Sequence, residues 1–324
     1  MNTLKSLIVA FVLLSFTTLV NAQVLGIATL SPGSSFFSVG TSIAGVMQQK
    51  GNLTTRVQPT SGSSVYIPIL NRGEVEFGIA SSLDVSNAYL GVKNFNNHKN
   101  PEVRLVGVVF AIPIGIAVAN DSPVKSISDL KGLRMPSQFT AQASLLLQQN
   151  AMLAVSGLST TDMTPYPVAN YLKGMEALAE GRVDAATFCV GCAKAQEVNV
   201  ALASHGGLRF LPLPDTTEAL AAIHKVFPSA YLKVFQPSPA LAGVTTPTRL
   251  MVSSGFLLTN AKVSEDVVYK TTKLLYENKL MLETATQYMK SFEPSLMAEA
   301  NVVPYHPGAE KFYKEVGQWP PKER

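Results

Sequence analysis

The 324-residue sequence is poor in the residues that most often carry catalysis or bind metal ions. Its four histidines are His98, His205, His224 and His306, and no two of them have the His-x-x-x-His spacing of a zinc-binding helix. No serine lies in a Gly-x-Ser-x-Gly turn. A hydrolase would require a serine, a histidine and an acid that only the fold brings together. We therefore predict a protein that is not an enzyme and has no metal and no cofactor.

Cysteine is equally scarce. The two cysteines, Cys189 and Cys192, form the sequence Cys-Val-Gly-Cys. In an exported protein such a pair is a redox motif or a local disulfide. A thioredoxin-type motif opens a helix after a strand, whereas residues 182–188 predict a strand that enters a glycine turn. We predict two small residues lining a turn and leave their oxidation state open.

Charged residues make up only 15% of the chain, and no run of basic residues occurs. The net charge of +4 falls to +3 when Lys5 is set aside, so nucleic acid is not expected as a partner. Neither Gly/Ser-rich turn near the N-terminus carries the lysine of a nucleotide-binding loop. Ala, Val, Leu, Ser and Gly are abundant, as in α/β proteins with buried parallel strands.

The first residues predict export. Lys5 precedes an apolar stretch over residues 7–20, which is short for a membrane span, and Val20, Asn21 and Ala22 suit a cleavage site. We predict a signal peptide over residues 1–22, cleaved after Ala22, and a periplasmic protein; the alternative is a retained anchor. Later apolar runs are all interrupted by charged residues, asparagine or proline.

The next residues contain the same pattern twice. An apolar run over residues 24–28 leads into a turn at residues 31–35 and then a predicted helix; residues 55–58, 60–64 and 65–70 repeat this order. A strand, a small hydroxyl-rich turn and a helix place free backbone N–H groups where they bind a small anion.

The rest of the chain continues this α/β alternation. Residues 103–110 and 115–119 predict two strands, and Pro113 between them predicts a bend where the chain passes to a second lobe. Residues 248–258 predict the return strand, and Ser264 is expected to cap the helix that follows. The predicted division is lobe 1 over residues 23–110, lobe 2 over 111–240, and a return to lobe 1 with C-terminal helices over 241–324.

Four segments resemble one family. Residues 24–84, 127–132 and 181–185 and the tail Val-Pro-Tyr-His-Pro-Gly-Ala-Glu-Lys-Phe-Tyr-Lys-Glu at 303–315 are similar to the TAXI family, the solute-binding proteins of TRAP (tripartite ATP-independent periplasmic) transporters. The resemblance implies a type II periplasmic binding-protein fold, in which two α/β lobes joined by crossing hinge strands close on a small solute. It also implies a TRAP-type membrane permease as partner, and acidic ligands such as glutamate and 2-oxoglutarate.

The sequence departs from the usual family pattern in two turns. Residues 31–36 read Ser-Pro-Gly-Ser-Ser-Phe, where the family has glycines around a Ser/Thr pair followed by tyrosine. Residues 137–142 read Ser-Gln-Phe-Thr-Ala-Gln in place of a Gly-Ser-Gly-Thr turn. These changes replace contact groups, so they leave the identity of the ligand open.

The chemistry of the residues predicts where a ligand would bind. The ends of strands and the first turns of helices should line the cleft, because unpaired backbone N–H groups point outward there. Hydroxyls and amides at these places suit carboxylate oxygens, and aromatic rings suit the ligand body, although any single serine or threonine is also an ordinary helix cap. The predicted ligand-binding residues are Ser34, Ser35, Phe36, Ser63, Ser64, Ser82, Gln138, Thr140, Gln142, Asn170, Phe188 and Cys189.

Charged partners are less clearly indicated. A dicarboxylate often binds an arginine, and Arg56 and Arg134 are the best placed because they precede the two turns. Asp84 is expected to cap a helix, the alternative being contact with a ligand amine. The tail segment His306-Pro307-Gly308 is expected to take part in the surface by which the permease recognises the closed protein.

Together these observations predict an extracytoplasmic protein that captures a small organic anion and delivers it to a TRAP-type permease. The anion would be a dicarboxylate, a 2-oxo acid or an acidic amino acid. Two alternatives remain: a ligand-binding partner of a membrane sensor kinase, and a secreted antigen with no role in transport.

Overall fold

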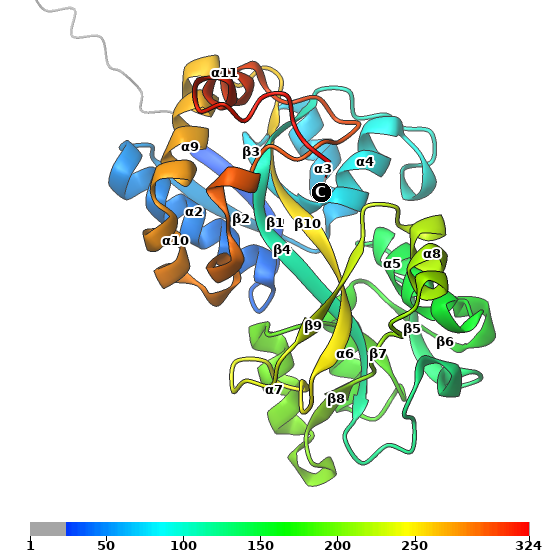
Figure 1. The fold of residues 1–324 in the computed structure, drawn as a ribbon. Helices are drawn as coiled ribbons and strands as arrows, with labels where there is room; N and C mark the ends of the chain where they lie inside the picture. The colour runs from blue at the N-terminus through cyan, green and yellow to red at the C-terminus, as the bar shows by residue number, and fades with distance from the viewer. Residues whose placement is uncertain (1–23, 324) are drawn as a thin grey trace, which may run out of the picture.

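The computed structural model describes residues 24–323, which form two α/β lobes joined by two long strands (Figure 1). The two-lobed fold with crossing strands that the sequence predicts is confirmed. The predicted signal peptide, residues 1–22, lies outside the described residues.

Lobe 1 is built on parallel strands. Its sheet has the order β2-β1-β3, and β1 pairs with both neighbours in parallel. Helices pack around this sheet, and the C-terminal helix α11 (Pro307–Glu315) lies at the end of the lobe away from lobe 2 (Figure 1). The elements of lobe 1 are β1 (Leu25–Leu30), α2 (Ser35–Gly51), β2 (Thr55–Thr60), α3 (Ser63–Arg72), β3 (Phe77–Ser81), α4 (Ser82–Leu90), α9 (Glu265–Glu277), α10 (Lys279–Ala285) and α11 (Pro307–Glu315).

Lobe 2 has shorter strands. A separate two-stranded parallel sheet joins β5 to β6, and the other strands pair with the ends of the two long strands. The elements of lobe 2 are β5 (Arg134–Gln138), α5 (Ser144–Leu153), β6 (Thr164–Val168), α6 (Tyr171–Ala179), β7 (Ala186–Cys189), α7 (Ala193–Ala201), β8 (Leu208–Phe210), α8 (Thr217–Val226) and β9 (Tyr231–Phe235).

Two long antiparallel strands, β4 (Val103–Ala119) and β10 (Thr248–Asn260), run through both lobes and form the hinge (Figure 1). The prediction of two separate strands on either side of Pro113 is wrong: β4 is one strand that continues through the proline, which pairs with Val252 of β10. The fixed φ of proline is compatible with extended backbone, so the residue removes one hydrogen-bond donor without ending the strand.

Serine side chains cap two of the helices, and the cap at Ser264 confirms the prediction from the sequence. The side chain of Ser34 accepts a hydrogen bond from the Phe37 N–H at the start of α2, and Ser264 accepts one from the Val267 N–H at the start of α9. Each cap satisfies one of the backbone donors that a helix start leaves unpaired. These local contacts fix where α2 and α9 begin.

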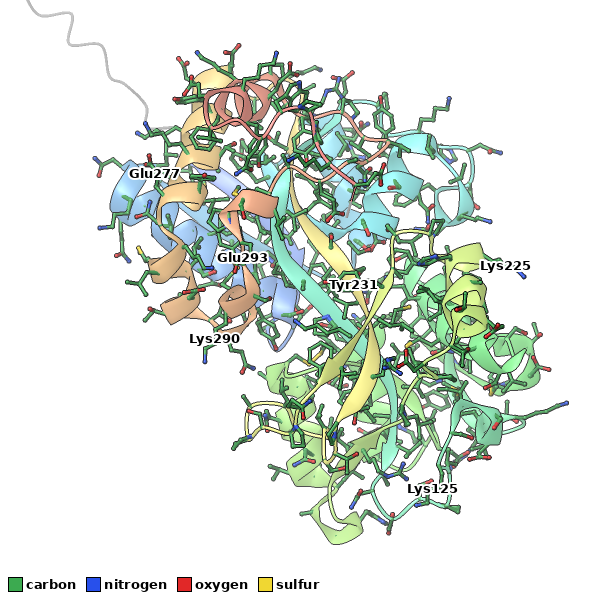
Figure 2. All side chains as sticks on the ribbon, viewed as in Figure 1. Lys125, Lys225, Tyr231, Glu277, Lys290 and Glu293 are labelled. Atoms are coloured by element: carbon green, nitrogen blue, oxygen red, sulfur yellow. A yellow bond between two sulfur atoms is a disulfide. The ribbon has the colours of Figure 1, made fainter. Side chains whose placement is uncertain are left out.

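The residues labelled in Figure 2 differ in position. Lys125, Lys225 and Glu277 point outward from the two lobes, whereas Tyr231 of β9 lies beside the crossing strands. Within residues 24–323, no helix combines the length and the apolar character that crossing a bilayer requires.

Candidate functional site

A cavity lies where the two lobes meet, against the β4 hinge strand. Four helices begin at it, α2 and α4 from lobe 1 and α5 and α6 from lobe 2, so backbone N–H groups from both lobes converge there. It encloses about 380 Å³, including its mouth, but only about 20 Å³ is wide enough for the centre of a water molecule. The lining residues are Ser35, Phe36, Ser81, Asp84, Ile112, Ile114, Gln142, Leu145, Gln148, Tyr171, Thr187, Phe188 and Cys189.

Five of the residues predicted from the sequence line this cavity: Ser35 and Phe36 from lobe 1, and Gln142, Phe188 and Cys189 from lobe 2. The Phe36 ring packs edge-on against Phe110 of β4, with the ring centres 5.4 Å apart. The same arrangement holds Phe188 against Phe210, at 6.3 Å. These contacts fix one aromatic wall in each lobe.

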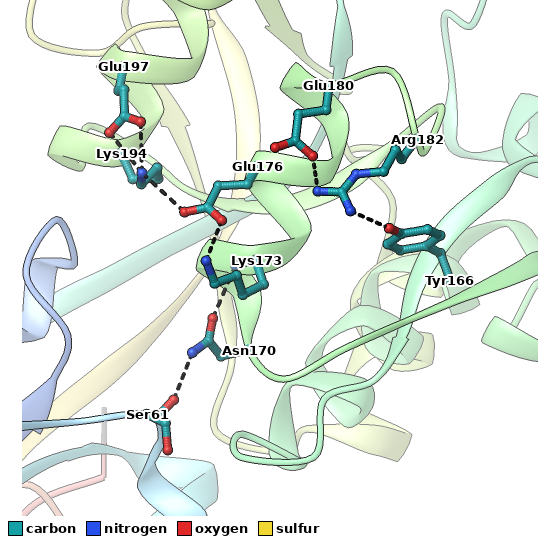
Figure 3. Close-up of polar contacts among 9 residues, drawn as sticks. All are labelled: Ser61, Tyr166, Asn170, Lys173, Glu176, Glu180, Arg182, Lys194 and Glu197. Atoms are coloured by element: carbon teal, nitrogen blue, oxygen red, sulfur yellow. Dashed lines mark hydrogen bonds and ion pairs between the residues drawn. The ribbon is translucent and has the colours of Figure 1, made fainter.

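Two other predicted residues join the lobes at the rim of the cavity. The Asn170 side-chain amide donates to the Ser61 carbonyl at 2.9 Å, while its oxygen accepts from the Lys173 N–H and caps α6 (Figure 3). The Ser64 hydroxyl accepts from the Ala143 N–H at 3.3 Å. Both contacts exist only when the lobes are together.

Ser63 and Ser82 also bond side chains outside their own helices. The Ser63 hydroxyl donates to Asp84, and the Ser82 hydroxyl shares a hydrogen bond of 2.9 Å with Ser229 of lobe 2. Ser34 is buried as the cap of α2 and does not line the cavity. The sequence could not separate these roles, because a serine at a helix start suits all of them.

Gln138 and Thr140 lie away from the cavity, with both side chains exposed. Gln138 and Phe139 have positive φ angles of 66° and 44°. This left-handed backbone favours glycine. The turn therefore has the same kind of backbone conformation that a glycine-rich turn adopts easily, although its residues here are glutamine and phenylalanine.

No arginine, lysine or histidine lines the cavity among residues 24–323. Arg134, one of the two predicted ligand partners, donates instead to both oxygens of Asp184. Arg56 is exposed on β2 and lines no part of the cavity. Four other arginines are engaged as well: Arg72 with Glu74, Arg182 with Glu180, Arg249 with Asp215, and Arg104 with the backbone carbonyls of Pro101 and Val103.

The cations at the rim of lobe 2 are also paired. Lys173 and Lys194 both contact the Glu176 carboxylate, at 2.7 and 3.4 Å, and Lys194 also reaches Glu197 at 2.8 Å (Figure 3). Burial opposes the charge of Glu176, yet hydrogen bonds from the two lysines hold the pKa of its carboxyl below the ordinary value. These groups form a charged rim and leave the cavity itself without a positive side chain.

The one charged residue in the cavity lining is Asp84, which was expected to cap a helix. That expectation is wrong, because the cap of α4 is the Ser81 hydroxyl, which accepts from the Asp84 N–H at 3.1 Å. The Asp84 carboxylate is buried and accepts hydrogen bonds from the hydroxyls of Ser63 at 2.8 Å, Ser81 at 2.6 Å and Ser144. Burial raises the pKa of this carboxyl, and the three hydrogen bonds oppose the rise.

Tyr171, the first residue of α6, is a cavity residue that the sequence did not indicate. It is 5% exposed, and its hydroxyl has no partner with hydrogen-bond geometry among the described residues. Burial raises the pKa of this hydroxyl, and the nearby Ser34 hydroxyl and Ser35 backbone act in the opposite direction. The one feature of the sequence that could have indicated Tyr171 is its position directly after Asn170, the cap of α6.

We expect Tyr171→Phe to separate stability from binding. Removing a buried hydroxyl that lacks a partner should leave the free energy of unfolding unchanged or slightly increased. If the hydroxyl binds the solute, the solute Kd should rise by about 2- to 12-fold, the value of one hydrogen bond. Chemical denaturation and calorimetric titration measure the two effects. Lower stability with unchanged affinity would show that the hydroxyl has a structural role.

Cys189 and Cys192 are joined by a disulfide within the predicted turn. The turn between them touches other parts of the protein on two sides: the Val190 N–H donates to the Pro113 carbonyl at 3.0 Å, and the Gln287 side chain of lobe 1 donates to the Gly191 carbonyl. The disulfide thus closes a turn that forms part of the contact between the lobes.

His306 does not have the surface position that recognition by a permease requires. It is 2% exposed and caps α11, its Nδ1 accepting from the Gly308 N–H at 3.2 Å. Buried His306 therefore cannot itself touch a partner, whereas its neighbour Pro307 is exposed, and recognition of this tail by a permease stays a prediction. The tail sequence that surrounds this residue has a structural role.

A second, wider hollow lies on the opposite face of β4. Ala111 and Pro113 line it, whereas Ile112 and Ile114 line the cavity, as alternate residues of a strand do. It encloses about 840 Å³, including its mouth, and Lys233 and Lys290 are among the residues that line it. No residue predicted for the site lines it.

Comparison with known proteins agrees with this fold. The chain matches the sequence model of the NMT1-like family over residues 27–317. It is similar to a solved structure described as a periplasmic transporter, with 13% identity, 92% of this chain and 94% of the other covered, and a TM-score of 0.57. It is also similar to the substrate-binding protein of an amino acid ABC transporter, with 14% identity, 83% and 100% covered, and a TM-score of 0.51. The fold is that of periplasmic binding proteins.

Proposed function

The chain belongs to the NMT1-like family, and we propose that it is an extracytoplasmic solute-binding protein that captures one small organic solute between its lobes. The observation that carries this proposal is the cavity at which α2, α4, α5 and α6 all begin. Helix starts from opposite lobes bind a carboxylate through backbone N–H groups and dipoles without needing a positive side chain.

The mechanism is closure about the hinge without chemistry. Separating the lobes breaks the contacts of Asn170 with Ser61 and of Ser64 with Ala143, and a bound solute restores contact across the cavity. The solute therefore shifts the population toward the closed form. The present cavity has room for about one water molecule, so a solute with several heavy atoms must widen it.

The partner that we propose is a TRAP-type permease in the membrane that separates the cytoplasm from the periplasm. Support comes from the resemblance of the N-terminal units and the tail to TAXI proteins, and from the predicted signal peptide. The similar structures of a periplasmic transporter and of an amino acid ABC transporter's binding protein support solute binding in general. The proposed solute carries a carboxylate, as dicarboxylates, 2-oxo acids and amino acids do.

A solute panel tests the proposal. The protein is exported with its own leader, purified and melted against dicarboxylates, 2-oxo acids, amino acids and neutral sugars. A ligand at about a hundred times its Kd adds about 2.7 kcal/mol to the free energy of unfolding. For a chain of this length, this corresponds to a rise in Tm of about 4 °C. If no compound raises Tm, even after unfolding and refolding to remove carried-over solute, the proposal fails.

A further inference from the structure

The cavity contains a buried negative charge with no counter-ion. Asp84 is 2% exposed and forms no ion pair within residues 24–323. Its hydrogen-bond donors in these residues are neutral: its partners are the hydroxyls of Ser63, Ser81 and Ser144. A buried carboxylate is costly unless it is both hydrogen-bonded and paired with an opposite charge.

The hydrogen bonds leave room for one more donor. A carboxylate has about four acceptor positions. Oδ1 accepts from Ser63 and Ser144, whereas Oδ2 accepts from Ser81 alone. An asparagine could accept hydrogen bonds from hydroxyls without bringing a charge into the cavity. The hydrogen bonds by which Asp84 links α3, α4 and α5 therefore require neither a negative charge nor the open acceptor position on Oδ2.

We propose that Asp84 binds a protonated amine of the solute. This inference rests on the proposed function and adds to it the chemical class of the solute: a small molecule with an ammonium group, accompanied by a carboxylate at the helix starts near Ser35 and Tyr171. Dicarboxylates and 2-oxo acids bring only negative charge to a cavity that already holds a carboxylate. Of the two acidic ligands that the family resemblance implies, the proposal thus favours glutamate, which carries an amine, over 2-oxoglutarate, which does not.

The first test needs no variant. The affinity of the purified protein is measured by calorimetry for two sets of matched compounds. In the first set, L-glutamate and 4-aminobutyrate carry an amine, and 2-oxoglutarate and glutarate do not. In the second set, L-alanine carries an amine, and pyruvate and propionate do not. The panel extends to the other common amino acids, each with its 2-oxo acid. In any set that binds, the aminated compound should bind at least about 30-fold more tightly than its partner without an amine.

The second test changes the carboxylate. Asp84→Asn should raise the Kd of the aminated compound by about 30-fold or more and change that of its 2-oxo acid little, so that the preference disappears. The control is the double variant Lys233→Ala and Lys290→Ala in the second hollow, which should leave amine binding unchanged. Because the first test uses the unaltered protein, misfolding of Asp84→Asn would not decide the matter.

The outcomes separate the two proposals. A 2-oxo acid or dicarboxylate that binds as tightly as its aminated partner overturns the role of Asp84 while the proposed function stands. Anion binding that survives Asp84→Asn but is lost in the lysine double variant would move the site to the second hollow. If no compound binds at all, the proposed function and this inference fail together.

Discussion

Replacing Gly62 by alanine should hold the two lobes apart and raise the Kd of the solute by about 100-fold. Gly62 precedes α3 at the point where lobe 1 touches the loop before α5. Its φ of 176° is ordinary extended backbone, so the close approach alone requires glycine there. An added Cβ would lie 1.7 Å from the Ala141 carbonyl oxygen and 2.4 Å from its carbon.

The loop cannot simply move aside. The Ala141 N–H donates to the Ala169 carbonyl at 2.9 Å, and the Gln142 N–H donates to the Phe139 carbonyl at 2.8 Å, both within lobe 2. Relieving the clash therefore requires the lobes to separate. If closure becomes less favourable by about 3 kcal/mol, the solute loses about two orders of magnitude in affinity.

Calorimetry and small-angle scattering measure the expected loss of affinity and the larger radius of gyration. Gly45→Ala is the matched control, because no atom other than those of its own helix backbone and chain neighbours lies within 4 Å of its added Cβ. Alanine inside α2 should stabilise the protein by about 0.5–1 kcal/mol and leave the solute Kd unchanged. Wild-type affinity and radius in Gly62→Ala would show that the lobes do not close through this contact.

Gly308→Ala should destabilise the protein by about 3 kcal/mol without changing the affinity of the folded molecule for solute. Gly308 lies in the first turn of α11, which packs on α9 at backbone distance. An added Cβ would lie 2.3 Å from the Glu265 carbonyl oxygen and 2.7 Å from the Tyr269 nitrogen. The two helices would have to separate, and they lie on the side of lobe 1 away from lobe 2 (Figure 1).

Thermal melting tests this expectation. For a chain of this length, 3 kcal/mol corresponds to a fall in Tm of about 5 °C. Lys311→Ala, an exposed change in the same helix, should leave Tm almost unchanged. A Gly308→Ala protein that melts with the wild type would show that α11 shifts freely on α9. The structural role assigned to the tail would then be wrong.

The sequence predicted those parts of the fold that depend on neighbouring residues. The cap at Ser264 and the first two strand–turn–helix units are short-range features, so periodicity and cap residues suffice to locate them, whereas Ser34 was predicted to bind ligand and instead caps α2. Pro113 misled the prediction because its effect on a strand depends on which partner needs the missing N–H, and β10 was not visible in the local sequence.

The site was predictable only in part, for the same reason. Strand ends and helix starts indicated Ser35, Phe36 and Gln142, because turn chemistry is local. The sequence alone also determined the class of the fold, through its alternating strands and helices. Only the tertiary structure decided that Asp84 meets Ser144, sixty residues further along the chain, in a cavity without a cation. Contacts between the lobes depend on how the whole chain packs. The type of a residue in one lobe does not identify the residue that it meets in the other.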